Sequence, residues 1–179
     1  MDITTIDKDT IERARKIKLM LLDVDGVLTD GRIIYNSDGT DSKFFDVHDG
    51  MGIALMSRVN IPTILISARS SRVIKRRAKD MQVERVYEDA NCKIDVFKEV
   101  LNDYKLPAEE ICFIGDDLVD LAILKKVGLA VAVRNACSDI KETAHYVTKL
   151  TGGKGAVREV VELIMKSQGL WNKVLQEFS

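Results

Sequence analysis

Short apolar runs rich in Val, Ile and Leu alternate with segments of helical periodicity along most of the chain. The apolar runs cover residues 18–22, 62–66, 84–87, 111–114 and 129–133. The helical segments cover residues 51–59, 71–81, 93–104, 118–125, 138–143 and 155–166. Continuous apolar runs are typical of strands buried on both faces. Their alternation with helices predicts an α/β fold, a doubly wound parallel sheet of the Rossmann-like kind.

One segment, residues 31–47, interrupts the alternation. It contains Arg-Ile-Ile-Tyr at 32–35 and Lys-Phe-Phe-Asp-Val at 43–47, on either side of a polar stretch with an Asp-Gly pair. Two short runs of β-forming residues around such a turn predict a β-hairpin. A chain of 179 residues with 46% apolar content suits one domain. We therefore expect a single domain over 1–179, with a hairpin insertion and no cap domain.

Charge and composition exclude several classes of function. The 27 basic and 28 acidic residues nearly cancel, and no long run of one sign predicts a nucleic-acid-binding surface. No apolar stretch approaches the roughly 18 residues that span a bilayer, and the first residues lack the pattern of an export signal. The three cysteines are widely spaced, which favours reduced thiols. We expect a cytoplasmic protein without membrane or nucleic-acid partners.

Polar side chains follow the predicted strands at the points where they end or where the next helix begins. These residues are Asp23, Asp25, Ser67, Arg69, Lys93, Asp116, Asp117 and Asp120. Ligands of open parallel sheets bind at the carboxyl ends of the strands. A single Asp there often only caps a turn, but five carboxylates at one edge repel one another unless a cation or a proton balances them. Because the ligands are oxygens and the two histidines have no metal-binding partners in sequence, Mg²⁺ is the predicted ion.

The order of these residues resembles the four motifs of the haloacid dehalogenase superfamily of phosphotransferases. Asp23-Val-Asp25-Gly is similar to the first motif, Ser67 to the second, Lys93 to the third, and the stretch 115–120 to the fourth. The resemblance extends over almost the whole chain. It implies a phosphatase in which Asp23 is the nucleophile, Asp25 the general acid and base, and Ser67 and Lys93 ligands of the phosphate.

The same resemblance implies a metal site. Mg²⁺ would be held by Asp23, Asp116 and the backbone carbonyl of Asp25, with Asp117 and Asp120 in supporting roles. The chemistry agrees, because a carboxylate attacks an anionic phosphate only when a cation reduces their repulsion. Asp25 stands two residues beyond the nucleophile in extended chain, so both side chains would point to the same side.

Longer stretches resemble the capless sugar-acid phosphatases, a family typified by 3-deoxy-D-manno-octulosonate 8-phosphate phosphatase. These stretches are residues 23–31, the predicted hairpin, 45–52 and 151–159. The substrate-binding residues that the resemblance implies are Asp25, Asp46, Val47, His48, Asp49, Gly50, Arg69, Arg77 and Lys93. Ser67-Ala-Arg69 departs from the usual Thr-Gly-Arg of the family but keeps the hydroxyl donor. The expected reaction is hydrolysis of a sugar-acid phosphate monoester, 3-deoxy-D-manno-octulosonate 8-phosphate first, through an aspartyl-phosphate.

Two further expectations concern the quaternary structure and the C-terminal tail, 151–179. The resembling family implies a homotetramer in which a neighbouring subunit's hairpin covers the active site. The glycines of 151–155 favour a flexible spacer, and we expect Lys154 and Arg158 in this tail to reach toward the phosphate. If this segment helps to retain substrate or to release product, truncation after Thr151 should change the Michaelis constant or the turnover.

Three other functions remain open at this point. A nonulosonate 9-phosphate phosphatase would present the same phosphate and carboxylate ends. A regulatory domain of the same fold would need no turnover, but intact Asp23 and Asp25 disfavour it. A receiver-type signalling domain would carry its phosphate-accepting Asp on a middle strand after the acidic pair, which is the reverse of the order here.

Overall fold

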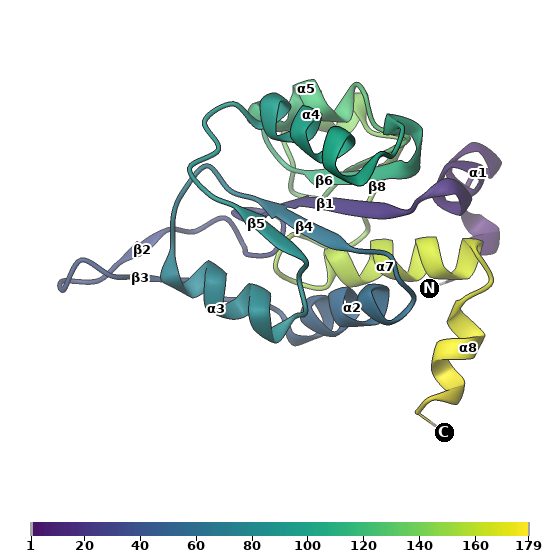
Figure 1. Ribbon diagram of the computed structural model, residues 1–179, viewed down its shortest axis with the longest axis horizontal. Helices are drawn as coiled ribbons and strands as arrows, with labels where there is room; N and C mark the ends of the chain where they lie inside the picture. The colour runs from purple at the N-terminus through teal and green to yellow at the C-terminus, as the bar shows by residue number, and fades with distance from the viewer. Residues whose placement is uncertain (1, 179) are drawn as a thin grey trace.

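The computed structural model describes residues 2–178, whose centre is a six-stranded sheet between two layers of helices (Figure 1). The strands are β1 Leu19–Asp23, β4 Thr63–Ile66, β5 Arg85–Tyr87, β6 Ile111–Gly115, β7 Leu129–Ala132 and β8 Tyr146–Val147. All neighbouring pairs are parallel, in the order β5-β4-β1-β6-β7-β8. This confirms the predicted doubly wound parallel sheet.

Strand β1 lies at the centre of the sheet, and all five of its residues are buried. Met20 pairs with Thr63 of β4 on one side and with Cys112 of β6 on the other. The chain leaves β1 toward β4 and β5 and then crosses to β6 on the opposite side. The carboxyl ends of β1 and β6 therefore meet where the winding direction changes, which is where doubly wound folds bind ligands.

The main helices cover both faces of the sheet. Helices α4 (Lys93–Tyr104) and α5 (Leu121–Leu124) lie on one face, and α2 (Val47–Arg58), α3 (Arg72–Asp80) and α7 (Ala156–Ser167) on the other (Figure 1). The shorter elements are α1 Lys8–Lys16, α6 Ser138–Thr143, α8 Trp171–Gln176 and the 3-10 turns Ile3–Thr5, Ala108–Glu110 and Leu118–Asp120. The sequence pattern did not predict α1 or β8.

The hairpin is present but shorter than predicted. Its strands are β2 (Ile34–Tyr35) and β3 (Asp41–Ser42), which pair antiparallel. The prediction of a strand at 43–47 was wrong, and so was the helix start at Met51. The Asp46 carboxylate accepts a hydrogen bond from His48 N at 2.6 Å and so caps α2, which begins at Val47. Within residues 2–178, only this hairpin and α2 lie between β1 and β4, so the core carries no separate cap domain there.

The C-terminal segment is not a flexible spacer, which corrects the sequence-based expectation. Gly152 and Gly153 are buried against the loop after β1, and Gly153 N donates to Val27 O at 2.9 Å. A Cβ atom on Gly152 would lie 1.7 Å from Gly26 O. Helix α7 then packs against α2, with Val157, Val160 and Leu163 fully buried. Truncation after Thr151 would therefore remove part of the core instead of a loose tail.

Between residues 2 and 178, the structure has no helix with the length and apolar character required to traverse a lipid bilayer.

Candidate active site

The carboxylates at the ends of β1 and β6 form one cluster. Oxygens of Asp23, Asp116 and Asp120 all lie within 4.8 Å of one another. Asp23 is the last residue of β1, Asp116 directly follows β6, and Asp120 ends the following 3-10 turn. The predicted gathering of acidic side chains at this sheet edge is thus present. Asp117 points elsewhere, because it is exposed and its carboxylate caps that turn at Leu118 N, 2.8 Å away.

Lys93 supplies the positive charge of the cluster. It is the first residue of α4 and is buried, and its Nζ lies 2.8 Å from Asp23 Oδ1 and 2.6 Å from Asp120 Oδ1. Burial opposes the charge on this amine, but the two carboxylates outweigh it and raise the pKa of Lys93. Lys93 therefore stays charged beside the predicted nucleophile.

Asp120 holds this arrangement together. One of its oxygens accepts from Lys93, and the other accepts from Asp116 N at 3.0 Å. The carboxylate is fully buried, and a Cβ atom on Gly115 would lie 2.6 Å from its Oδ2. Both oxygens are thus used inside the protein, which suits the supporting role expected for Asp120.

Asp23 and Asp116 have the character of metal ligands. The pKa of Asp23 is raised, mainly because the carboxylate is buried and secondly because of the negative charge of Asp120. The pKa of Asp116 is raised in the same way, first by burial and then by the charge of Asp23. Asp116 Oδ1 is buried and has no hydrogen-bond partner among the described residues. Crowded anions with an unpaired buried oxygen fit a hard divalent cation such as Mg²⁺. Asp23, Asp116 and the Asp25 backbone carbonyl are the groups that would hold it.

Gly26 allows the backbone to pass close to this site. It has a φ of +98°, and a Cβ atom here would lie 2.0 Å from Asp116 Oδ2. Another residue type would be strained in this conformation and would displace the predicted metal ligand.

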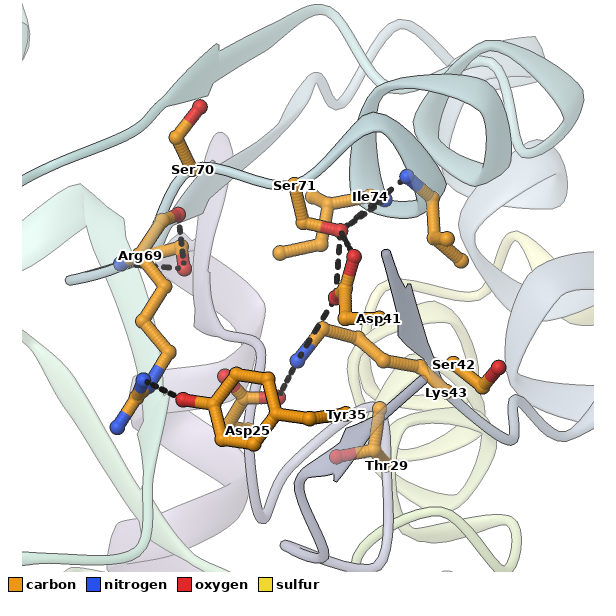
Figure 2. A network of polar contacts seen from close by, with 12 residues as sticks. Asp25, Thr29, Tyr35, Asp41, Ser42, Lys43, Arg69, Ser70, Ser71 and Ile74 are labelled. Carbon is orange, nitrogen blue, oxygen red and sulfur yellow. Dashed lines mark hydrogen bonds and ion pairs between the residues drawn. The ribbon is translucent and has the colours of Figure 1, made fainter. Parts of the chain in front are cut away.

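The Asp25 side chain contacts a lysine that the sequence analysis did not identify. Lys43 Nζ lies 2.5 Å from Asp25 Oδ1, and the Lys43 side chain is 2% exposed (Figure 2). Lys43 belongs to the hairpin, immediately after β3. Asp41 and Lys43 are two residues apart in extended chain and so face the same side, a pattern that could have indicated their shared environment.

Ser67 and Arg69 occupy the loop after β4. Ser67 is buried, its Oγ accepts from Arg69 N at 3.1 Å, and it donates to Arg69 O at 2.9 Å. The Arg69 side chain is exposed and donates from Nη1 to Tyr35 Oη of the hairpin at 3.0 Å (Figure 2). The hairpin therefore contacts both the Asp25 side and the Arg69 side of the site.

The predicted substrate-binding stretch 46–50 forms the first turn of α2 and its cap. Val47 and His48 are exposed there, and Arg77 Nη2 of α3 donates to Asp46 O at 3.1 Å. A Cβ atom on Gly50 would lie 2.3 Å from the same guanidinium nitrogen, so the glycine makes room for Arg77. Arg77 thus lies against this stretch.

Asp49 has a structural contact that its sequence position did not indicate. Its buried carboxylate accepts from Arg158 N at 2.8 Å and from Gly155 N at 3.2 Å, which caps the start of α7. Burial raises the pKa of Asp49 to about 6, against the opposing effect of these amide donors. The Asp49 side chain therefore links α2 to the N-terminal end of α7.

Known proteins share this fold and resemble the sequence over most of its length. A family model described as haloacid dehalogenase-like hydrolase matches residues 74–160. The 3-deoxy-D-manno-octulosonate 8-phosphate phosphatase KdsC of Escherichia coli K12 is 37% identical over 164 residues, which cover 92% of this chain and 87% of the relative.

Solved structures of phosphatases also resemble this chain over almost its whole length. One is the 3-deoxy-D-manno-octulosonate 8-phosphate phosphatase from Moraxella catarrhalis in complex with magnesium, phosphate and KDO. It has a TM-score of 0.93 and 36% identity, and the match covers 96% of this chain and 98% of that one. A probable YrbI family phosphatase from Pseudomonas syringae also has a TM-score of 0.93, with 38% identity and the same coverage. The chain therefore belongs to the haloacid dehalogenase-like hydrolases, in the family of the 3-deoxy-D-manno-octulosonate 8-phosphate phosphatases, which are phosphoric monoester hydrolases.

Proposed function

We propose that this protein is a magnesium-dependent phosphatase that hydrolyses 3-deoxy-D-manno-octulosonate 8-phosphate, a sugar-acid precursor of lipopolysaccharide. The observation that carries the proposal is the buried cluster in which Lys93 bridges Asp23 and Asp120. Beside it lies Asp116 Oδ1, which has no hydrogen-bond partner within residues 2–178. The substrate is supported by the relatives that carry this name at 36–37% identity over most of the chain.

The first half of the reaction uses Asp23 and Asp25. An Asp23 carboxylate oxygen attacks phosphorus, the bond from phosphorus to the sugar oxygen breaks, and Asp25 gives its proton to that leaving oxygen. Lys93 and Ser67 would hold the phosphate during this step. The products are an aspartyl-phosphate on Asp23 and the free sugar acid.

The second half regenerates the enzyme. Asp25, now ionised, takes a proton from water, and the water oxygen attacks phosphorus of the aspartyl-phosphate. The bond from phosphorus to the Asp23 oxygen breaks, so inorganic phosphate leaves and Asp23 returns as a carboxylate. Mg²⁺ held by Asp23, Asp116 and the Asp25 carbonyl would neutralise phosphate charge in both halves. Asp120 keeps Lys93 in place throughout, and Asp117 stabilises the loop that bears Asp116.

The sugar-acid end of the substrate would meet residues around the mouth of this site. We assign Arg69, Arg77 and the stretch Asp46, Val47, His48, Asp49 and Gly50 to this region. Guanidinium groups bind carboxylates through paired hydrogen bonds, which suits a substrate with a carboxylate and a phosphate. For Asp49 the backbone would make the contact, because its side chain caps α7.

The proposal includes a single-domain cytoplasmic enzyme that assembles as a homotetramer. Tyr35 and Phe44 of the hairpin are 72% and 63% exposed. Large apolar groups of this kind on a two-stranded hairpin gain stability from a packing surface, which a neighbouring subunit would provide.

A substrate panel tests the function directly. Phosphate release would be measured with 3-deoxy-D-manno-octulosonate 8-phosphate, a nonulosonate 9-phosphate and a neutral hexose 6-phosphate, each with Mg²⁺. We expect the highest kcat/KM for the eight-carbon acid. A higher value for the nine-carbon acid would reassign the substrate, and no release from any of the three would refute the phosphatase assignment.

A further inference from the structure

Lys43 has a buried side chain on a hairpin that also carries strongly exposed apolar groups. Its side chain is 2% exposed, whereas Tyr35 and Phe44 are 72% and 63% exposed. An ammonium group loses its hydration when it is buried, so such a position is disfavoured unless anions compensate for it. The compensation here comes from Asp25, 2.5 Å from Nζ, and more weakly from Asp41, 3.9 Å away.

The hairpin is held in place at Asp41. Its two carboxylate oxygens lie 2.8 and 3.1 Å from Ser71 Oγ, the side chain that also caps α3 through Val73 N and Ile74 N (Figure 2). A line of contacts therefore runs from the start of α3 through Asp41 and Lys43 to Asp25. The hairpin thus places the positive charge of Lys43 beside Asp25 in the active site of the same chain.

Lys43 contacts Asp25 through one carboxylate oxygen, Oδ1. With Oδ1 held by Lys43, the carboxyl group keeps a fixed rotamer, and its other oxygen, which would carry the proton for the leaving group, points in a defined direction. A general acid must lie within hydrogen-bond reach of the leaving oxygen, and a displacement of about 1 Å costs on the order of 100-fold in rate. A contact that fixes the orientation of Asp25 would therefore increase the rate of the reaction.

We propose that Lys43 is a positioning residue that orients Asp25 toward the leaving oxygen, anchored in turn by Asp41 and Ser71. The inference rests on the proposed phosphatase function. It makes the hairpin part of the catalytic apparatus of its own subunit, in addition to any contact with a neighbour. The expected consequence is a dependence on leaving-group chemistry, because only a poor leaving group needs the proton from Asp25.

The test compares two substrates in Lys43→Met, which keeps the length of the side chain and removes its charge. For 3-deoxy-D-manno-octulosonate 8-phosphate, an alkyl phosphate, kcat/KM should fall by about 100-fold. For p-nitrophenyl phosphate, whose phenolate departs without a proton, kcat/KM should fall by less than about threefold. The parameter kcat/KM extends only to loss of the leaving group, so the role of Asp25 in water activation does not affect it.

Three variants serve as controls. Lys43→Arg should restore much of the activity on the alkyl phosphate, since it keeps a cationic donor. Lys98→Met removes an exposed lysine that also pairs with an aspartate, 2.8 Å away, and should leave both substrates unchanged. Asp41→Asn keeps Lys43 but weakens its anchor, so the ratio between substrates should change in the same direction by a smaller factor; it also serves as the test if Lys43→Met does not fold.

An equal fall for both substrates in folded Lys43→Met or Asp41→Asn would overturn the inference, because it would indicate a general structural or phosphate-binding role. A wild-type protein that hydrolyses neither substrate would instead refute the proposed function, so the two failures are distinct.

Discussion

Lys93 Nζ lies 2.8 Å from Asp23 Oδ1, although one residue ends β1 and the other begins α4. Both side chains are buried, so the pair is shielded from water and its attraction is stronger than that of a surface pair. A buried carboxylate would otherwise tend to be protonated and lose its nucleophilic charge. The charge of Lys93 opposes this effect of burial and so favours the ionised, attacking form of Asp23 where the phosphate must bind.

Replacement of the nucleophile gives the most direct prediction. Asp23→Asn should reduce kcat by at least about 1000-fold, because an amide of the same shape has no charge with which to attack phosphorus. The variant should retain the circular dichroism spectrum of the wild type. Appreciable activity in a fresh preparation, with deamidation excluded by mass spectrometry, would show that another group is the nucleophile.

Removal of the metal should abolish turnover. After exhaustive chelation we expect no measurable phosphate release, and Mg²⁺ should restore it, because the oxygen ligands Asp23 and Asp116 suit that ion. Calcium should restore much less, since its larger and more variable coordination shell does not hold nucleophile and phosphate in line. Full activity in the chelated protein would contradict the metal assignment.

Gly152 should tolerate no side chain. A Cβ atom would lie 1.7 Å from Gly26 O, so Gly152→Ala must displace the loop that follows the nucleophile. We expect this variant to lose about 2 kcal/mol more unfolding free energy than Gly169→Ala, in urea denaturation, and to have reduced kcat. Gly169 is a stringent control, because no atom lies within 4 Å of its Cβ position, while its φ of +72° makes an alanine there strained for a reason other than contact. Equal losses would mean that the loop adapts without strain.

Asp49 should make stability depend on pH. Its pKa is raised to about 6, whereas an aspartate in an unfolded chain titrates near about 3.9. Between these values the folded state binds more protons, so the contribution of Asp49 is fully present below about pH 4 and is lost as the pH rises through 6. Relative to Asp49→Asn, the unfolding free energy of the wild type should fall by about 2 kcal/mol from pH 4.5 to pH 7.5.

Urea denaturation of both proteins at the two pH values measures this difference, and the subtraction removes groups that titrate equally in both. The opposite slope would mean that the amide donors at Gly155 and Arg158 outweigh the burial of the carboxylate.

A charged substitution at Phe44 should disrupt the proposed homotetramer. Phe44→Asp places a charge on the exposed face of the hairpin, so the proposed tetramer should dissociate into smaller species in sedimentation velocity. Activity on the sugar-acid phosphate should fall more than activity on p-nitrophenyl phosphate, because a small ester depends less on a covered site. A wild-type protein that is a fully active monomer at assay concentration would refute the proposal that a neighbouring subunit covers the active site.

The local sequence determined much of this protein. Buried strands carry continuous apolar runs because both faces of the sheet are covered, so β1, β4 and β6 were predictable from residue order alone. The acidic residues that follow β1 and β6 could be assigned to one edge, because parallel strands align their carboxyl ends. Asp23 and Asp116 were identified in this way, whereas the role of Lys93 came from the resemblance to the family motifs.

Contacts between distant segments were decided only by the tertiary structure. Lys43 looked like an ordinary strand residue until the fold placed it 2.5 Å from Asp25. Asp49 caps α7, which begins more than a hundred residues further along the chain. Gly152 packs against Gly26, in the loop that follows β1 and Asp23. A periodic pattern reports which side of an element is buried, but not which partner it meets. Those partners depend on how the hairpin, α2 and α7 pack together, and this packing is what completes the site.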